Sequence, residues 1–107
     1  MAKSIPELVR ALKVGNDDSK ARAAGALGNR VCNNPGNRVA IAAAGAIEPL
    51  VALLKTGNES AKWFAAGVLG NLAHNNDDNK VAIATADAIP LLTFVRKLAG
   101  SPIDKIE

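Results

Sequence analysis

The sequence predicts an all-α protein built as a solenoid, in which helices of successive repeats stack on one another. Sliding the 107-residue chain along itself by ~42 residues superposes identical residues at roughly half of the paired positions, the mark of a helical repeat array. The segment AAGALGNRV at residues 23–31 thus falls on AAGVLGNLA at residues 65–73. Apolar residues also recur at three- and four-residue steps, which is the period of an amphipathic helix. Abundant alanine suits thin, closely stacked helices better than a deep globular core.

The first two helices are predicted over residues 5–14 and 19–32. Pro6 lies near the start of the first, where a missing N–H costs nothing, and Gly15 follows its end. Short polar residues, Asp17, Asp18 and Ser19, are expected to cap the second. The apolar residues expected on its buried face are Ala23, Ala24, Leu27 and Val31.

The same pattern then returns, beginning with a short helix. Residues 33–36 break the second helix, and Asn37 is expected to cap a short helix over residues 38–44. A middle-length helix and a long helix follow, and a second short helix is capped by Asn79. Asp87 takes the turning position of Gly45. These predicted helices cover residues 47–55, 59–74, 80–85 and 89–98, with the start of another at residues 103–107.

We therefore interpret the chain, residues 1–107, as one domain of about two to two and a half repeats. It contains a partial repeat at residues 5–36, a complete one at 37–78 and a partial one at 79–107. The stop just where a third long helix would begin favours a piece cut from a longer array or a degenerate gene product.

Composition narrows the function classes. The formal net charge is +3, and basic and acidic residues alternate without a basic block, so we expect no nucleic-acid partner. The longest charge-free run, residues 39–47, is far shorter than the ~20 apolar residues that span a bilayer, so we expect no membrane partner. The single cysteine, Cys32, cannot form an intrachain disulfide. A cytoplasmic protein, with the nucleus as a further compartment, is expected.

Three helices per unit resemble the armadillo repeat more than the two-helix HEAT repeat. Residues 37–54, NRVAIAAAGAIEPLVALL, are similar to the run from the first to the second armadillo helix, and residues 65–73 resemble the third helix. The array looks most like the regular alanine- and glycine-rich armadillo proteins of plants, algae and oomycetes. The resemblance implies a right-handed α-solenoid whose third helices line a concave groove. In that groove Asn29 and Asn71 would bind the backbone of an extended peptide.

The resemblance is incomplete at the groove. Importin-type relatives carry a Trp four residues before this Asn, whereas this chain has Gly25 and Gly67. Recognition of a nuclear import signal is therefore not expected.

A helical wheel extends the predicted groove around the two asparagines. It places seven residues on the groove side, namely Arg22, Gly25, Asn29, Phe64, Gly67, Asn71 and His74, with Trp63 at the edge. Each keeps a structural alternative: the asparagines can bond neighbouring backbone, and the aromatic residues can pack between repeats. Cys32 is interpreted as a small apolar filler. His74 and Cys32 alone make no metal site, and no catalytic constellation or cofactor motif is present.

The sequence thus predicts a non-enzymatic scaffold that binds an extended peptide or a partner protein and needs no cofactor. The alternative is a structural fragment that self-associates into a homo-oligomer without a peptide ligand. The last predicted helix lacks the long helix that would cover its apolar residues, and an uncovered apolar end marks an interface. The residues expected in this contact are Leu91, Leu92, Phe94 and Val95.

Overall fold

The computed structural model describes residues 3–32 and 34–87, which are all helix, turn and extended linker with no strand. The predicted helix over residues 89–98, the start of another at 103–107 and the self-association residues Leu91, Leu92, Phe94 and Val95 lie outside the described residues. The helices are α1 (Ile5–Lys13), α2 (Asp17–Val31), α3 (Pro35–Ala43), α4 (Ile47–Thr56) and α5 (Glu59–Ala73), followed by a helix over residues 77–87.

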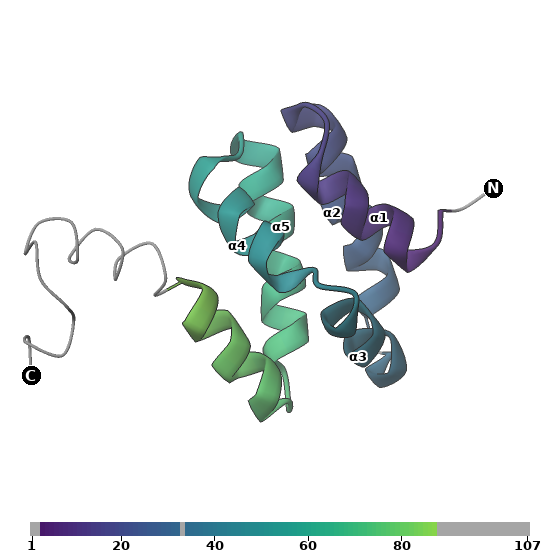
Figure 1. Cartoon of the computed structure of the whole chain (residues 1–107), viewed down its shortest axis with the longest axis vertical. Helices are drawn as coiled ribbons and strands as arrows, with labels where there is room; N and C mark the ends of the chain where they lie inside the picture. Colours follow the sequence, from purple (N-terminus) through teal and green to yellow (C-terminus); the bar gives the residue numbers. More distant parts are fainter. Residues whose placement is uncertain (1–2, 33, 88–107) are drawn as a thin grey trace, which may run out of the picture.

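The predicted order of short, middle-length and long helices is confirmed in the complete unit. Helices α3, α4 and α5 contain 9, 10 and 15 residues. Helices α3 and α4 meet at 83°, and Gly45 between them has φ +86°, a backbone angle that favours glycine. Helices α1 and α2 repeat the middle-length and long helices. The long helices α2 and α5 pack side by side, with α1 against α2 and α4 against α5 (Figure 1).

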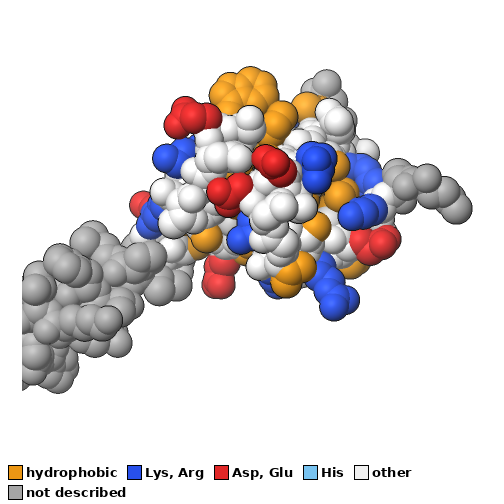
Figure 2. All heavy atoms as spheres, turned by 90° about the horizontal axis from the view of Figure 1, so that it is seen from above, with side chains coloured by type: hydrophobic (Ala, Val, Ile, Leu, Met, Phe, Trp, Pro, Cys, Tyr) orange, Lys and Arg blue, Asp and Glu red, His pale blue; other side chains and the backbone are white. Residues whose placement is uncertain are grey.

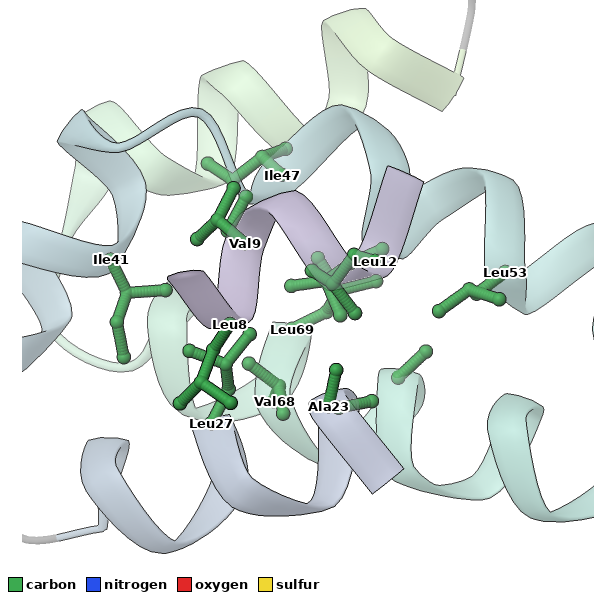
Figure 3. Close-up of a cluster of buried hydrophobic side chains, with 14 of the residues drawn as sticks. Leu8, Val9, Leu12, Ala23, Leu27, Ile41, Ile47, Leu53, Val68 and Leu69 are labelled. Carbon is green, nitrogen blue, oxygen red and sulfur yellow. The ribbon is translucent and has the colours of Figure 1, made fainter. Parts of the chain in front are cut away.

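The hydrophobic core lies between the two long helices, α2 and α5, and the helices α1 and α4 that pack against them. Leu8 and Leu12 of α1 and Leu50 of α4 are buried against the long helices, which contribute Leu27 and Val68. Figure 3 shows Leu8, Leu27 and Val68 converging, with Ile41 of α3 closing one side of the cluster. Most core side chains are aliphatic or alanine, because helices that approach closely leave little room for aromatic rings.

Asparagines cap α2 and α5, and the cap of α2 lies one residue before the first predicted candidate. Asn16 begins α2 and Asn58 begins α5, each accepting a hydrogen bond from a backbone N–H three residues on. The prediction that Asp17, Asp18 or Ser19 caps α2 was therefore wrong, since all three lie inside the helix. The carboxylates of Asp17 and Asp18 in the first turn instead interact favourably with the positive end of the helix dipole.

The short helices also begin earlier than predicted. Asn34 caps α3, and Pro35 starts that helix instead of breaking the preceding one. The helix at 77–87 likewise begins after Asn76, whose Oδ1 accepts from the Asn79 N–H. Asp87 is still helical, so it does not take the turning position of Gly45.

Asn37 and Asn79, which were predicted as caps, have a different function. Each lies one turn inside its short helix and reaches back to the preceding long helix. Asn37 Nδ2 donates to the Arg30 carbonyl at 2.7 Å, and Asn79 Nδ2 donates to the Leu72 carbonyl at 2.8 Å. These bonds satisfy a carbonyl that the end of an α-helix leaves without a partner. The repeated asparagines therefore fix the angle between a long helix and the next short one.

No described helix is long and apolar enough to cross a bilayer alone. Helices α3 and α4 reach that length and apolarity only as a pair, and the pair is sharply bent.

Candidate functional site

The seam between α2 and α5 is closed by small residues under large ones. A Cβ placed on Gly25 would lie 3.4 Å from the Phe64 ring, and one on Gly28 would lie 3.7 Å from Val68. The Phe64 ring therefore rests on the backbone of α2. Glycine at this position lets the two long helices approach and forms the floor of a groove between them.

That groove has a volume of about 420 Å³ and takes residues from both long helices. Four of the seven predicted residues line it together: Arg22, Gly25 and Asn29 from α2, and Phe64 from α5. The structure adds three residues that were not predicted, Asp18, Ala21 and Ser60. Asp18 precedes Arg22 by one helical turn, and Ser60 precedes Phe64 by one turn. Helical spacing could therefore have identified both polar additions.

Trp63 stands beside the groove and does not line it. Its side chain is 73% exposed, and its ring meets the Phe64 ring edge to face, with the centroids 5.1 Å apart. A large exposed aromatic ring next to a groove is a common feature of binding surfaces.

Gly67, Asn71 and His74, which were predicted to share the groove, do not line it. Gly67 is exposed, and no described atom lies within 4 Å of a Cβ built on it. Asn71 Nδ2 donates to the carbonyl of Gly67 at 3.0 Å, one turn back along the same helix. The wheel grouped these residues with Phe64 on one side of α5, but of that group only Phe64 lines the groove with α2.

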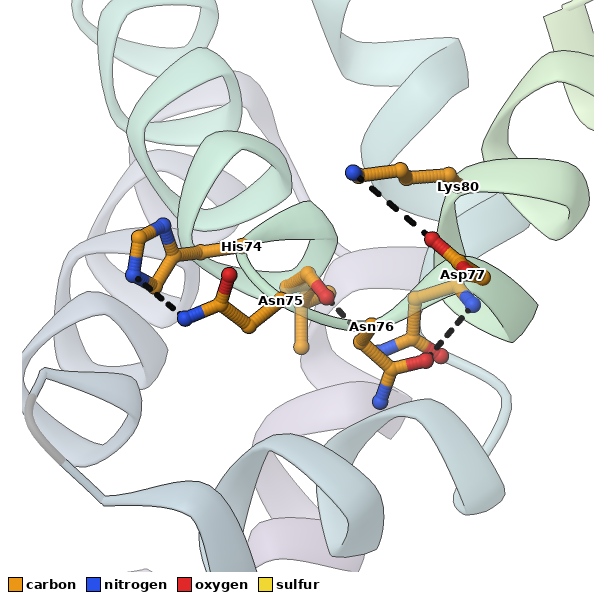
Figure 4. Close-up of polar contacts among 7 residues, drawn as sticks. His74, Asn75, Asn76, Asp77 and Lys80 are labelled. Carbon is orange, nitrogen blue, oxygen red and sulfur yellow. Dashed lines mark hydrogen bonds and ion pairs between the residues drawn. The ribbon is translucent and has the colours of Figure 1, made fainter.

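His74 and Cys32 occupy the ends of the long helices. Both were predicted as the last residues of their helices; in the structure both are C-cap residues just after the last helical residue, and both are exposed. The interpretation of Cys32 as an apolar filler was therefore wrong, because the helix ends at Val31 before the chain turns outward. Figure 4 shows His74 Nε2 meeting Asn75 Nδ2, at 3.3 Å. Within residues 3–32 and 34–87, no group of three or more His, Cys, Asp or Glu side chains could hold a metal ion.

Charge is mixed over the described surface. Figure 2 shows Lys and Arg side chains interspersed with Asp and Glu on one face, without a field of a single sign. The groove itself follows this pattern, since it carries Asp18 and Arg22 one helical turn apart. The arrangement offers hydrogen-bond donors and acceptors beside an aromatic ring.

The sequence matches the HEAT-like repeat family over residues 17–72, from the first residue of α2 into the last turn of α5. A comparison with curated proteins finds no match. HEAT-like repeats commonly act as protein-interaction scaffolds. The family match covers more than half of the chain, and the helices described above stack as repeats. The chain therefore belongs to the HEAT-like repeat family, as a helical repeat protein.

Proposed function

We propose that this protein is a non-enzymatic scaffold of the armadillo type, and that it holds an extended peptide or a partner protein in the groove between α2 and α5. The three-helix unit α3–α4–α5 supports the armadillo assignment, because the HEAT repeat has two helices. The groove supports the interaction, because its lining comes from two successive repeats.

One observation carries the proposal, namely the Phe64 ring seated on Gly25 and flanked by polar side chains from both long helices. An extended peptide presents unpaired N–H and C=O groups along its length. The Asn29 carboxamide supplies a donor and an acceptor, Arg22 supplies donors, and Asp18 supplies acceptors. The exposed ring of Trp63 gives a partner side chain a surface on which to pack.

A peptide selected for binding to the full chain provides the test. Ser60→Arg, which places a long side chain in the groove from the α5 side, should weaken binding about tenfold or more, measured by isothermal titration calorimetry. Ser60 is an exposed residue in the first turn of α5, so the fold should tolerate the change. Ala66→Arg is the matched control, because Ala66 is an exposed small residue of the same helix outside the groove.

Comparing the two variants also distinguishes binding in the groove from binding on the outer side of α5. If Ala66→Arg abolishes binding and Ser60→Arg does not, the partner docks on the outer side of α5 and the groove proposal fails. Asn71→Ala extends the test along α5. If the peptide continues past the groove, this substitution should lower the affinity for the peptide about fivefold without unfolding the protein.

Self-association remains a second proposal, favoured by an apolar hollow beside α4. The hollow measures about 370 Å³, and its lining includes Val51, Leu54, Leu69 and Ile83. Leu54 is 40% exposed there. Light scattering at micromolar concentration should then give an oligomer, and Phe94→Glu should return it to a monomer. A monodisperse monomer of the unmodified chain would refute self-association.

A further inference from the structure

A second hollow adjoins the groove on α2, where α1 packs against that helix. Its volume is about 510 Å³. The floor is apolar and includes Leu8 of α1 and Ala23 and Ala26 of α2. Three cationic residues, Lys3, Arg22 and Arg30, also line it. We call it the N-terminal hollow.

Comparison with the second repeat indicates which residues this face of α2 would have if another long helix packed on it. In the second unit the equivalent face of α5 packs on α2 through Phe64 and Val68, and Leu72 lies one turn further along the same face. The counterparts in α2 are Arg22, Ala26 and Arg30. Two large apolar residues are thus replaced by arginines. Another helix stacked here as α2 stacks on α5 would bury both guanidinium groups, at a high desolvation cost. A second copy of this chain is therefore a poor occupant.

The charged residues that line the N-terminal hollow are all basic. None of the described residues that line it is acidic. Nearby Glu7 is already engaged, because its carboxylate accepts from the Ser4 backbone N–H at 3.0 Å. Arg30 uses one Nη2 donor on the carbonyl of Lys3, and a guanidinium carries five donors. The remaining donors of Arg30 can bind a carboxylate in pairs.

We propose that the N-terminal hollow binds an acidic peptide segment of a partner protein, with an aliphatic side chain of that segment on the floor formed by Leu8, Ala23 and Ala26. Carboxylates of the segment pair with Arg30, Arg22 and Lys3. The apolar floor favours a peptide over a phosphate backbone, which has no group to place there. The lining also has no aromatic ring on which a base could stack. This site adjoins the α2–α5 groove, and Arg22 and Asn29 line both.

Fluorescence anisotropy with the full chain tests the proposal. The probe is a fluorescein-labelled peptide of sequence Glu-Asp-Leu-Glu-Asp-Leu-Glu-Asp, and its partner probe has lysine in place of every acidic residue. We expect the acidic peptide to bind and the lysine peptide not to bind. Raising NaCl from about 50 to about 300 mM should weaken the complex, because exposed charge pairs are screened.

Two variants locate the site. Lys3→Glu should weaken binding of the acidic peptide at least about threefold, and Arg30→Glu should weaken it more. Lys3 precedes α1 and offers its backbone carbonyl to Arg30, so Lys3→Glu keeps that bond and the fold. Lys62→Glu on α5 is the matched control, because it changes the net charge equally and lies outside the hollow.

Several outcomes would overturn the proposal. These are no binding of the acidic peptide, an equal loss with Lys62→Glu, or unchanged binding in Lys3→Glu and folded Arg30→Glu. Tighter binding of a single-stranded oligonucleotide than of the peptide would assign the hollow to nucleic acid. Ser60→Arg should leave the acidic peptide unaffected, so this site and the groove succeed or fail independently.

Discussion

The two long helices share a central motif, AAGALGN in α2 and AAGVLGN in α5, yet that motif is buried differently in each. In α2 the face toward α5 is covered, and Ala24 is 0% exposed. Its counterpart in α5 is Ala66, which is exposed together with Gly67 and Gly70. Trp63 occupies the position that buried Ala21 holds in α2. The same motif is therefore an inner seam in the first repeat and an outer surface in the second.

The difference shows that position in the stack decides what a repeated residue does. A long helix needs large residues on one side and small ones on the other, so that successive repeats interlock. Phe64 and Val68 are the large residues that meet the small side of α2. On α5 the side that carries small residues has no described neighbour and is exposed. On α2 the side that would carry large apolar residues has no described long helix against it, and it carries Arg22 and Arg30 instead.

The largest expected effect comes from a matched pair of core leucines. Leu27 of α2 is 0% exposed inside the seam, and its counterpart Leu69 is 6% exposed at the edge of the apolar hollow beside α4 (Figure 3). Leu27→Ala should lower the free energy of unfolding by about 3–5 kcal/mol and Leu69→Ala by about 2–3 kcal/mol, since an enclosed site leaves a larger cavity. Urea unfolding followed by circular dichroism measures both. Equal losses would mean that the two repeats are packed alike.

A second pair tests the two faces directly. Gly25→Leu must displace the Phe64 ring and should cost about 1–3 kcal/mol, as overpacking usually does. Gly67→Leu adds a side chain to an exposed helix face and should stabilise the protein by about 0.5–1 kcal/mol through helix propensity. Thermal unfolding of the two variants gives the comparison. A loss at Gly67 similar to that at Gly25 would show that another helix covers this face of α5.

The smallest effect concerns the two middle-length helices. Helix α1 begins with a capping box, in which Glu7 accepts from the Ser4 backbone N–H, whereas α4 begins without a side-chain cap. The backbone hydrogen bond from Ser4, followed by its side-chain hydrogen bond, lowers the pKa of Glu7 below its ordinary value. A lowered folded pKa stabilises above the unfolded pKa of about 4.3, and this contribution is lost as the pH falls through the folded value.

Glu7→Gln should therefore reduce the drop in melting temperature between pH 7 and pH 3. Glu48→Gln, in the first turn of uncapped α4, is the matched control. A larger change in the control than in Glu7→Gln would contradict the capping argument.

Much of the architecture was predictable. The ~42-residue period located the helices described here and their order of lengths, because a repeat that cannot bury its own apolar face must stack. The starts of α1, α4 and α5 were predicted at the correct residue, whereas those of α2 and of the two short helices were placed too late. Three asparagines lie around the start of each short helix, and sequence alone does not say whether Asn34 or Asn37 accepts the capping bond.

The candidate site was predicted in part, and for a clear reason. A helical wheel gives the direction of a side chain around its own helix, so it grouped Phe64, Gly67 and Asn71. It does not say which neighbour the helix meets. Packing against α2 placed Phe64 in the groove and left Gly67 and Asn71 outside it.

The sequence by itself determined the helical repeat, the unit of three helices and the small residues that let long helices approach, because periodicity and side-chain size are local properties. Only the tertiary structure decided which face of each long helix is covered, where the groove runs, and that the cations of the first repeat surround a hollow. These features depend on contacts between residues far apart in the chain, and two nearly identical segments receive different neighbours.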